Sequence, residues 1–140
     1  MNKIIFNPLF LVLFFFSCSK QKRIESKLNG FWRISKVYIE DGEGFFHDGN
    51  QYGQLQFSTN EKNCIGMVNY NYINQNGVVL HDSLKLNSKY QINAVEDRVL
   101  FLQNLNLYNF RILLLTKSDL QIEFYDLDNY RLTKFIFEKS

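Results

Sequence analysis

The feature that most constrains this chain of 140 residues is a series of short segments, from Leu28 onward, in which apolar and polar residues alternate. Tyr90–Ala94 and Leu120–Phe124 show the pattern most clearly, and a period of two is that of a β-strand with one buried face. Turn-forming residues separate these segments at intervals of about 8–12 residues, which is typical of antiparallel barrels and sandwiches. The sequence therefore predicts an all-β fold in one domain.

The composition favours the same fold class. Pro8 is the only proline, so no proline interrupts a later strand, and Ala94 is the only alanine, which argues against a rich helical content. The many Tyr and Phe residues favour sheet. The formal net charge of +2 is too small for the electrostatic footprint of a nucleic-acid-binding protein.

We expect strands over residues 29–40, 52–57, 64–73, 78–86, 90–94, 110–115, 120–124 and 130–137. Asn74-Gln75-Asn76-Gly77 predicts a hairpin, because Asn-Gly accepts positive φ at low cost. Asn87-Ser88 predicts a further turn. Residues 96–109 stay open, since a short helix near 96–106 fits their apolar pattern as well as a strand does.

The first expected strand opens with Gly30-Phe31-Trp32 and holds the only tryptophan. A buried Trp covers roughly 150–250 Å², so we expect Trp32 to anchor the core. Gly30 permits a tight turn or the close approach of another backbone.

The same strand needs one irregularity. Trp32 and Ile34 lie on one parity, whereas Val37 and Ile39 lie on the other. A one-residue bulge near Ser35–Lys36 brings both pairs to one face, because an extra residue on one strand reverses the alternation.

The N-terminus is a targeting segment. Lys3 precedes an apolar run from Ile4 to Phe16, which is shorter than the roughly 20 residues of a membrane-spanning helix and fits the apolar region of a signal peptide. Its end, Phe15-Phe16-Ser17-Cys18, resembles the bacterial lipobox, with Phe15 where Leu is usual. The resemblance implies cleavage between Ser17 and Cys18 and acylation of Cys18. The acyl chains then anchor the protein to a membrane in the bacterial envelope.

Residues 1–17 are therefore expected to be a lipoprotein signal peptide, residues 18–27 a polar lipidated tether, and residues 28–140 the folded domain. Lys20, Lys22, Arg23 and Lys27 make the tether basic. They are either a solvated linker or a contact with anionic headgroups. A basic rather than acidic segment after Cys18 favours an outer-membrane lipoprotein that faces the periplasm over one exposed at the cell surface.

The domain also resembles a known family. Gly30-Phe31-Trp32 resembles the Gly-x-Trp of lipocalins, and Ile112–Leu120 with the Phe-rich strand after it resembles the lipocalin-like domains of bacterial lipoproteins. The resemblance covers about Leu28 to Lys139, and the later Thr-Asp-Tyr of the longer lipocalin signature is absent. It implies a small antiparallel up-and-down barrel of about eight strands.

A barrel of this size either fills its interior with side chains or holds one small ligand. Phe57, Tyr70, Tyr72 and Tyr90 are the residues we expect either to line such a pocket or to form the core. In a pocket, the Tyr hydroxyls would supply the few polar contacts.

Few residues point to chemistry. His47 and His81 have no metal-ligand spacing, and Cys64 has no Cys or His nearby and is expected to be a buried apolar residue. His81-Asp82-Ser83 is more typical of a polar strand or turn than of a catalytic triad, and Asp126 and Asp128 of a turn than of a cation site.

We therefore predict no enzymatic activity, no cofactor and no metal. The predicted function is that of a monomeric, membrane-anchored protein that binds a small apolar or amphipathic ligand. The alternative is a protein-interaction or envelope-assembly module with a filled barrel.

Overall fold

A computed structural model describes residues 19–40, 45–46, 50–74, 76–128 and 130–140. Within these residues the chain forms one helix, residues 19–28, followed by strands only. The strands are β1 (Gly30–Glu40), β2 (Phe45–Phe46), β3 (Gln51–Ser58), β4 (Asn63–Ile73), β5 (Val79–Asn93), β6 (Arg98–Gln103), β7 (Asn106–Leu115), β8 (Asp119–Asp126) and β9 (Arg131–Lys139).

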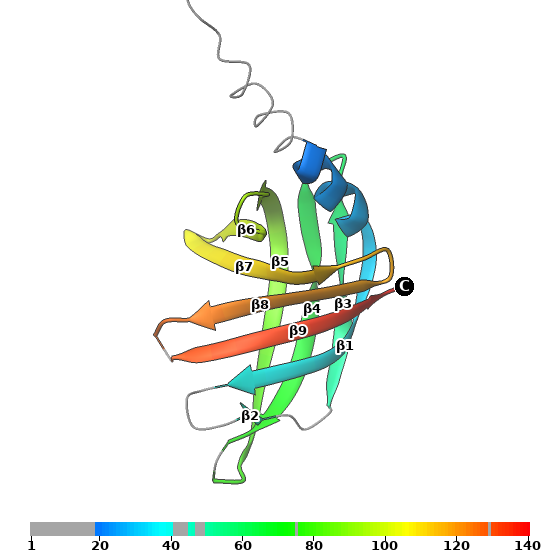
Figure 1. Cartoon of the computed structure of the whole chain (residues 1–140). Coiled ribbons are helices and arrows are strands. Elements are labelled where there is room, and N and C mark those ends of the chain that lie inside the picture. The colour runs from blue at the N-terminus through cyan, green and yellow to red at the C-terminus, as the bar shows by residue number, and fades with distance from the viewer. Residues whose placement is uncertain (1–18, 41–44, 47–49, 75, 129) are drawn as a thin grey trace, which may run out of the picture.

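The strands close into a barrel (Figure 1). β1 and β3 to β9 each pair antiparallel with their neighbours in chain order, and β9 pairs back with β1. β2 is a two-residue strand that pairs with the end of β1. The predicted up-and-down barrel of about eight strands is thus confirmed, and closure removes the exposed edges that an open sheet would present.

The predicted bulge in β1 is confirmed. Ile34 pairs with Phe137 and Lys36 with Ile136, so Ser35 is the extra residue on β1. The inward side chains are consequently Trp32 and Ile34 before the bulge and Val37 and Ile39 after it, all of them buried.

The possible helix near 96–106 is not present, because β6 and β7 occupy this range. Val99 and Phe101 point inward and are fully buried. A tight turn at Asn104 and Leu105, both with positive φ (51° and 65°), joins the two strands. Apolar residues also face outward here, as with Leu102, and this obscured the strand period in the sequence.

The turn predicted at Asn87-Ser88 is also wrong, because both residues lie inside β5. β5 pairs with β4 as far as Lys89 and with β6 from Tyr90 onward. A strand that changes partners in this way bends around the barrel without a chain reversal. The Asn74–Gly77 hairpin, by contrast, is confirmed: Ile73 pairs with Val79, and Gly77 has a φ of 77°.

The sequence predicted a polar tether over residues 18–27, but residues 19–28 form a helix at one end of the barrel (Figure 1). Ile24 and Leu28 are four residues apart and therefore share one face of the helix. Both side chains are buried and belong to the hydrophobic core. Only two of these ten residues are apolar, so the sequence shows no clear helical periodicity from which the helix could be predicted.

Barrel side chains donate to carbonyl groups in the last turn of this helix, where backbone donors within the helix run out. The indole Nε1 of Trp32 donates to the Leu28 carbonyl at 2.7 Å, and the hydroxyl of Thr59 donates to that of Glu25 at 3.1 Å. Lys139 Nζ donates to the Lys27 carbonyl at 3.2 Å and lies 5.0 Å from the centre of the Trp32 ring. The helix is therefore part of the folded domain.

The interior is densely aromatic. Phe57, Phe101, Phe110 and Phe137 are almost completely buried, with Trp32 beneath the helix. Ring centroids of Phe101 and Phe110 lie 5.7 Å apart in an edge-to-face arrangement, and those of Phe57 and Tyr90 lie 5.6 Å apart. Such pairs add about 0.5–1.5 kcal/mol each beyond their buried area.

Replacing Trp32 with Ala should lower the free energy of unfolding by about 3–5 kcal/mol, the cost of emptying a large buried site. Trp32→Phe should cost about 1–2 kcal/mol, because it leaves the Leu28 carbonyl without its donor. Urea unfolding measures both. Phe31→Ala is the matched control, since its side chain is 43% exposed, and a loss as large as that of Trp32→Ala would contradict the assigned anchor.

Candidate functional site

The residues that the sequence predicted to line a ligand pocket lie in two groups inside the barrel. Phe57 and Tyr90 are buried and contact one another near the end that the helix covers. Burial raises the pKa of Tyr90 to about 12. Tyr70 and Tyr72 lie toward the opposite end, where Tyr70 packs edge-to-face against Phe135 at 5.6 Å. All four take part in packing, and contact with a ligand stays a prediction.

A polar cluster occupies the interior at this opposite end. Arg131, the first residue of β9, donates from Nη1 to the Tyr72 hydroxyl at 2.8 Å and from Nη2 to Asp82 Oδ2 at 2.7 Å. Its guanidinium carbon also lies 5.2 Å from the centre of the Tyr72 ring. Arg131 therefore links β9 to β4 and β5 across the inside of the barrel.

Partial burial strengthens this cluster. The side chains of Arg131 and Asp82 are 18% and 37% exposed. Burial alone would lower the pKa of Arg131, but the hydrogen bond to Asp82 and the neighbouring tyrosines hold it above its ordinary value. Burial, assisted by Asp82, raises the pKa of Tyr70. Arg131 Nε is buried without a hydrogen-bond partner among the described residues.

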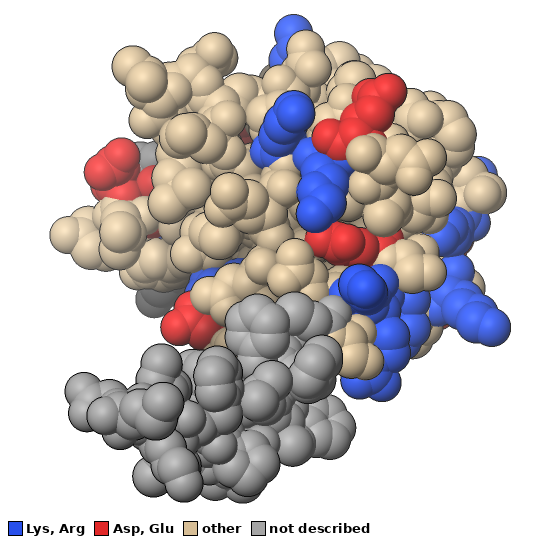
Figure 2. Space-filling model, turned by 90° about the horizontal axis from the view of Figure 1, so that it is seen from above, with Lys and Arg blue, Asp and Glu red and all other residues tan. Residues whose placement is uncertain are grey.

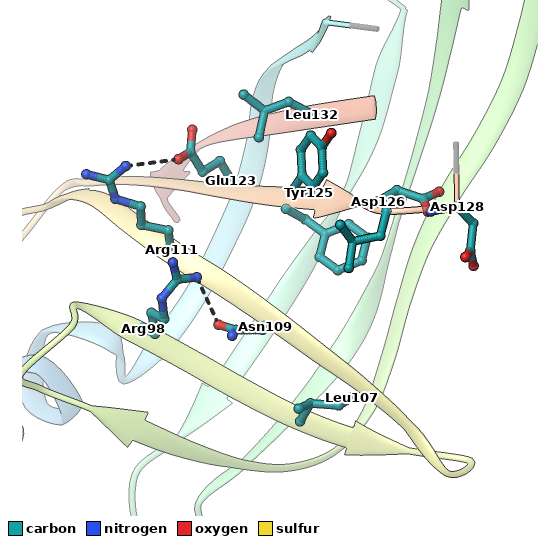
Figure 3. A pocket seen from close by; sticks show the side chains of 11 residues that line it. Arg98, Leu107, Asn109, Arg111, Glu123, Tyr125, Asp126, Asp128 and Leu132 are labelled. Atoms are coloured by element: carbon teal, nitrogen blue, oxygen red, sulfur yellow. Dashed lines mark hydrogen bonds and ion pairs between the residues drawn. The ribbon is translucent and has the colours of Figure 1, made fainter. Parts of the chain in front are cut away.

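Next to this cluster, the pairing between β7 and β8 in the barrel wall is interrupted. The ladder between β7 and β8 covers only Arg111–Leu115 and Leu120–Glu123. Beyond it, residues 106–110 pair with β6 and residues 124–126 pair with β9, but the two stretches do not pair with each other. Figure 3 shows β7 and β8 diverging at this point.

The gap between the two strands is a cleft of about 460 Å³. Its apolar lining consists of Leu107 from β7, Phe124 and Tyr125 from the end of β8, Leu127 from the turn after β8, and Leu132 from β9. Leu107, Tyr125 and Leu127 are 61%, 49% and 74% exposed. Phe124 is partly buried and contacts both Tyr108 (5.9 Å) and Phe110 (5.4 Å), so the floor of the cleft continues into the aromatic core.

Charged groups flank this apolar surface. Near one end, Arg98 Nη1 donates to Asn109 Oδ1 at 3.2 Å and Arg111 lies 3.5 Å from Glu123 (Figure 3). At the other end lie Asp126 and Asp128, and the Asp126 carboxylate accepts from the Asp128 backbone N–H at 3.0 Å, as a turn requires. Asp126 pairs in register with Arg131, so the cleft adjoins the polar cluster.

A second groove, of about 550 Å³, runs along the outer surface of β1, β7, β8 and β9. Tyr38, Leu113, Leu132 and Ile136 supply its apolar surface, and Glu40, Glu123 and Lys134 its charges. Glu123 and Leu132 also border the cleft, so the two depressions are adjacent.

The sequence analysis named Tyr72 as a pocket-lining residue, but it did not identify its partners Asp82 and Arg131 or the apolar lining of the cleft. Asp82 and Arg131 carry a usable signal, because each is a charged residue at an inward position, in line with Leu84 on β5 and with Thr133 on β9. The cleft carries no such signal, since it depends on where the β7–β8 ladder ends.

The other residues considered for chemistry lie apart. His81 and Ser83 are exposed on the outer face of β5, where His81 Nδ1 contacts Asn71 Oδ1, whereas Asp82 points inward. His47 and Cys18 lie outside the described residues. Cys64 is fully buried, as predicted, and burial raises the pKa of its thiol. Among the described residues, no three His, Cys, Asp or Glu side chains are grouped so that they could hold a metal ion.

In the part of the chain that the structure describes, no helix has the length and apolar character to cross a membrane. No protein-family model and no curated protein matches the chain. Bovine odorant-binding protein in complex with undecanal is a structural neighbour, with a TM-score of 0.39 and 16% identity over 82% of this chain and 72% of that chain. The bovine lipocalin allergen Bos d 2 is another, with a TM-score of 0.39 and 12% identity over 83% and 75% of the two chains.

A double-mutant cycle should show that the Arg131–Asp82 pair couples favourably by about 1–2 kcal/mol, because both side chains are partly withdrawn from water and joined by a charged hydrogen bond. Arg131→Ala, Asp82→Ala and the double variant are compared by urea unfolding. The Arg33–Glu138 pair, at 3.8 Å and mostly exposed, is the matched control and should couple by less than about 0.5 kcal/mol. Equal coupling in the two cycles would contradict the role of the cluster.

Proposed function

We propose that this protein binds small amphipathic molecules, without catalysis, in the cleft between β7 and β8. The main support for the proposal is the gap between β7 and β8, where Phe124 lies at the base of the cleft. Where the wall is closed, aromatic side chains fill the interior. At the cleft, apolar side chains remain exposed next to the core.

The cleft has the dimensions and chemistry of a small-molecule site. Its volume of about 460 Å³ falls within the roughly 300–1,000 Å³ that such sites occupy. Covering about 100 Å² of its apolar lining would contribute roughly 2.5 kcal/mol. The apolar middle and charged flanks favour a ligand with one apolar part and one polar end. Tyr70 and Tyr72, in the adjoining cluster, are the predicted lining residues nearest to this site.

We also propose that the protein is an envelope lipoprotein, acylated at Cys18 after cleavage behind Ser17, and that it faces the periplasm. The support is the apolar segment Ile4–Phe16 followed by Ser17-Cys18. Acylation with more than one chain would anchor the protein far more firmly than a single chain, which binds membranes only marginally.

A protein-interaction module is the second candidate, favoured by the outer groove lined by Tyr38, Leu113, Leu132 and Ile136. A partner protein that covers this groove would remove its apolar surface from water. Under this candidate the barrel is filled and the cleft takes up no small amphiphile, so a ligand-binding experiment separates the two functions.

Photolabelling tests the cleft. A decanoic acid that carries a diazirine, added below saturation to the anchored protein in nanodiscs, should label peptides that contain residues 107–110 and 124–132. The double variant Leu107→Glu/Leu127→Glu should reduce this labelling about tenfold, since it places two carboxylates on the apolar lining and removes on the order of 1.4 kcal/mol of binding free energy.

Ile65→Glu/Met67→Glu is the matched control, because these two side chains on β4 are 50% and 45% exposed and do not line the cleft. This variant adds the same charge and should leave the labelling unchanged. Labelling spread evenly over the surface, or equally reduced in both variants, would refute the proposed site.

Labelled palmitate tests the anchor. The wild-type chain, expressed in a bacterium with an intact lipoprotein pathway, should incorporate it, and Cys18→Ala should not. Cys64→Ala should incorporate as much as the wild type, since the Cys64 thiol is buried. Incorporation that persists in Cys18→Ala would show that Cys18 is not the acylated residue.

A further inference from the structure

We propose that the outer face of the helix at residues 19–28 docks on an anionic lipid surface and holds the helix-covered end of the barrel against the membrane. The opposite end, with the polar cluster and the cleft, then points into the aqueous phase. This inference rests on the proposed acylation of Cys18, and it adds a second contact and a fixed orientation to that anchor.

The charged residues on the outer face of this helix are all basic. Ile24 and Leu28 point into the core, which leaves Lys22, Arg23 and Lys27 exposed on the other side. The residues between them on that face are Ser19 and Ser26, which are small and also exposed. None of the three basic side chains forms an ion pair within the described part of the chain.

The one acidic residue of the helix is kept away from this face. Glu25 lies 3.6 Å from Lys62 in the β3–β4 turn, and its side chain is only 12% exposed. Lys20, at the edge of the buried face, pairs with Asp97 at 2.8 Å. The barrel therefore neutralises Glu25 and leaves the charge of Lys22, Arg23 and Lys27 unbalanced.

This arrangement opposes the stability of the helix itself. Arg23 and Lys27 are like charges four residues apart on the helix, which repel. The helix is held instead by the burial of Ile24 and Leu28 and by the bonds to its last carbonyls. The basic residues of the helix thus weaken it locally, and contacts with the barrel compensate. Such a local violation is expected where a surface has a function.

The position of the helix selects a lipid surface as the partner. The described part of the helix starts at Ser19, the residue after Cys18, which is the proposed site of the acyl chains. The helix therefore lies at the anchored end of the chain and at one end of the barrel (Figure 1). Figure 2 views this end and shows Lys and Arg side chains gathered at one side of it. Basic side chains close to a lipid anchor are attracted by anionic headgroups.

The opposite end carries the other functional features. Arg131 and Asp82 lie there, and the cleft opens beside them between residues 106–110 and 124–128. Docking through the helix therefore keeps the part of the cleft at residues 106–110 and 124–128 clear of the bilayer and accessible to ligands in the periplasm.

Headgroup quenching tests the docked orientation in the full acylated protein, reconstituted into vesicles of phosphatidylcholine alone or with 30% phosphatidylglycerol. A fluorophore on Ser26→Cys reports on the basic face, and one on Asn76→Cys, in the β4–β5 turn, reports on the far end. The buried Cys64 should not take up the label. A nitroxide on the lipid headgroups is the quencher.

We expect the label at position 26 to be quenched strongly in the anionic vesicles and weakly in the neutral ones, and the label at position 76 to be quenched in neither. In the anionic vesicles, Lys22→Gln/Arg23→Gln/Lys27→Gln should lower the ratio of docked to undocked protein at least about tenfold. Added salt should act in the same direction.

Lys36→Gln/Lys85→Gln/Arg111→Gln removes the same number of charges from exposed positions outside the helix and should leave the quenching unchanged. Equal quenching at position 26 in both lipid mixtures, or stronger quenching at position 76, would overturn the proposal. Vesicle flotation identifies a failure of the anchor separately, because a protein without acyl chains does not float with the neutral vesicles.

Discussion

The structure depends most on Trp32, because this residue joins three parts of the molecule. Its backbone lies in β1, where the barrel closes, and pairs with Leu55 on β3 and Lys139 on β9. Its side chain is fully buried, and its indole nitrogen binds the last helical carbonyl, that of Leu28. One residue therefore fixes the start of the barrel, its closure and the helix that covers its end, so the helix cannot leave without exposing the core.

Two features determine where this barrel can bind a ligand: its interior is filled with side chains, and its wall is open between β7 and β8. Interior aromatic side chains contact one another along the barrel, from Phe57 near the helix to Phe135 beside Tyr70. A ligand that entered this region would have to displace packed rings, each worth several kcal/mol in place. The gap beyond Arg111 and Glu123 avoids this cost, because the floor of the cleft reaches the core through Phe124 without any ring being displaced.

Local patterns revealed most of the fold in advance. The burial of Trp32, the bulge at Ser35 and the Asn-Gly hairpin each follow from a few neighbouring residues, and the structure confirms all three. The predictions failed where a strand has apolar residues on both faces, as in β6, and where a strand changes partners, as at Lys89. The cleft could not be predicted from the sequence, because the point at which two strands stop pairing depends on the curvature of the whole barrel. The inward positions of Asp82 and Arg131, by contrast, could have been predicted from strand parity.

The helix shows why composition alone misjudged the segment after Cys18. Four basic residues among ten suggest a solvated tether, and in isolation this sequence would not hold a helix, since helices this short are marginal in water. The barrel supplies what the segment lacks: a site for Ile24 and Leu28, donors for three carbonyls, and Lys62 for Glu25. Lys22, Arg23 and Lys27 are therefore exposed on a rigid helix and not on a flexible chain. A rigid helix loses little conformational freedom when it meets a charged surface, so fixing these side chains on a helix converts their charge into a defined orientation of the barrel.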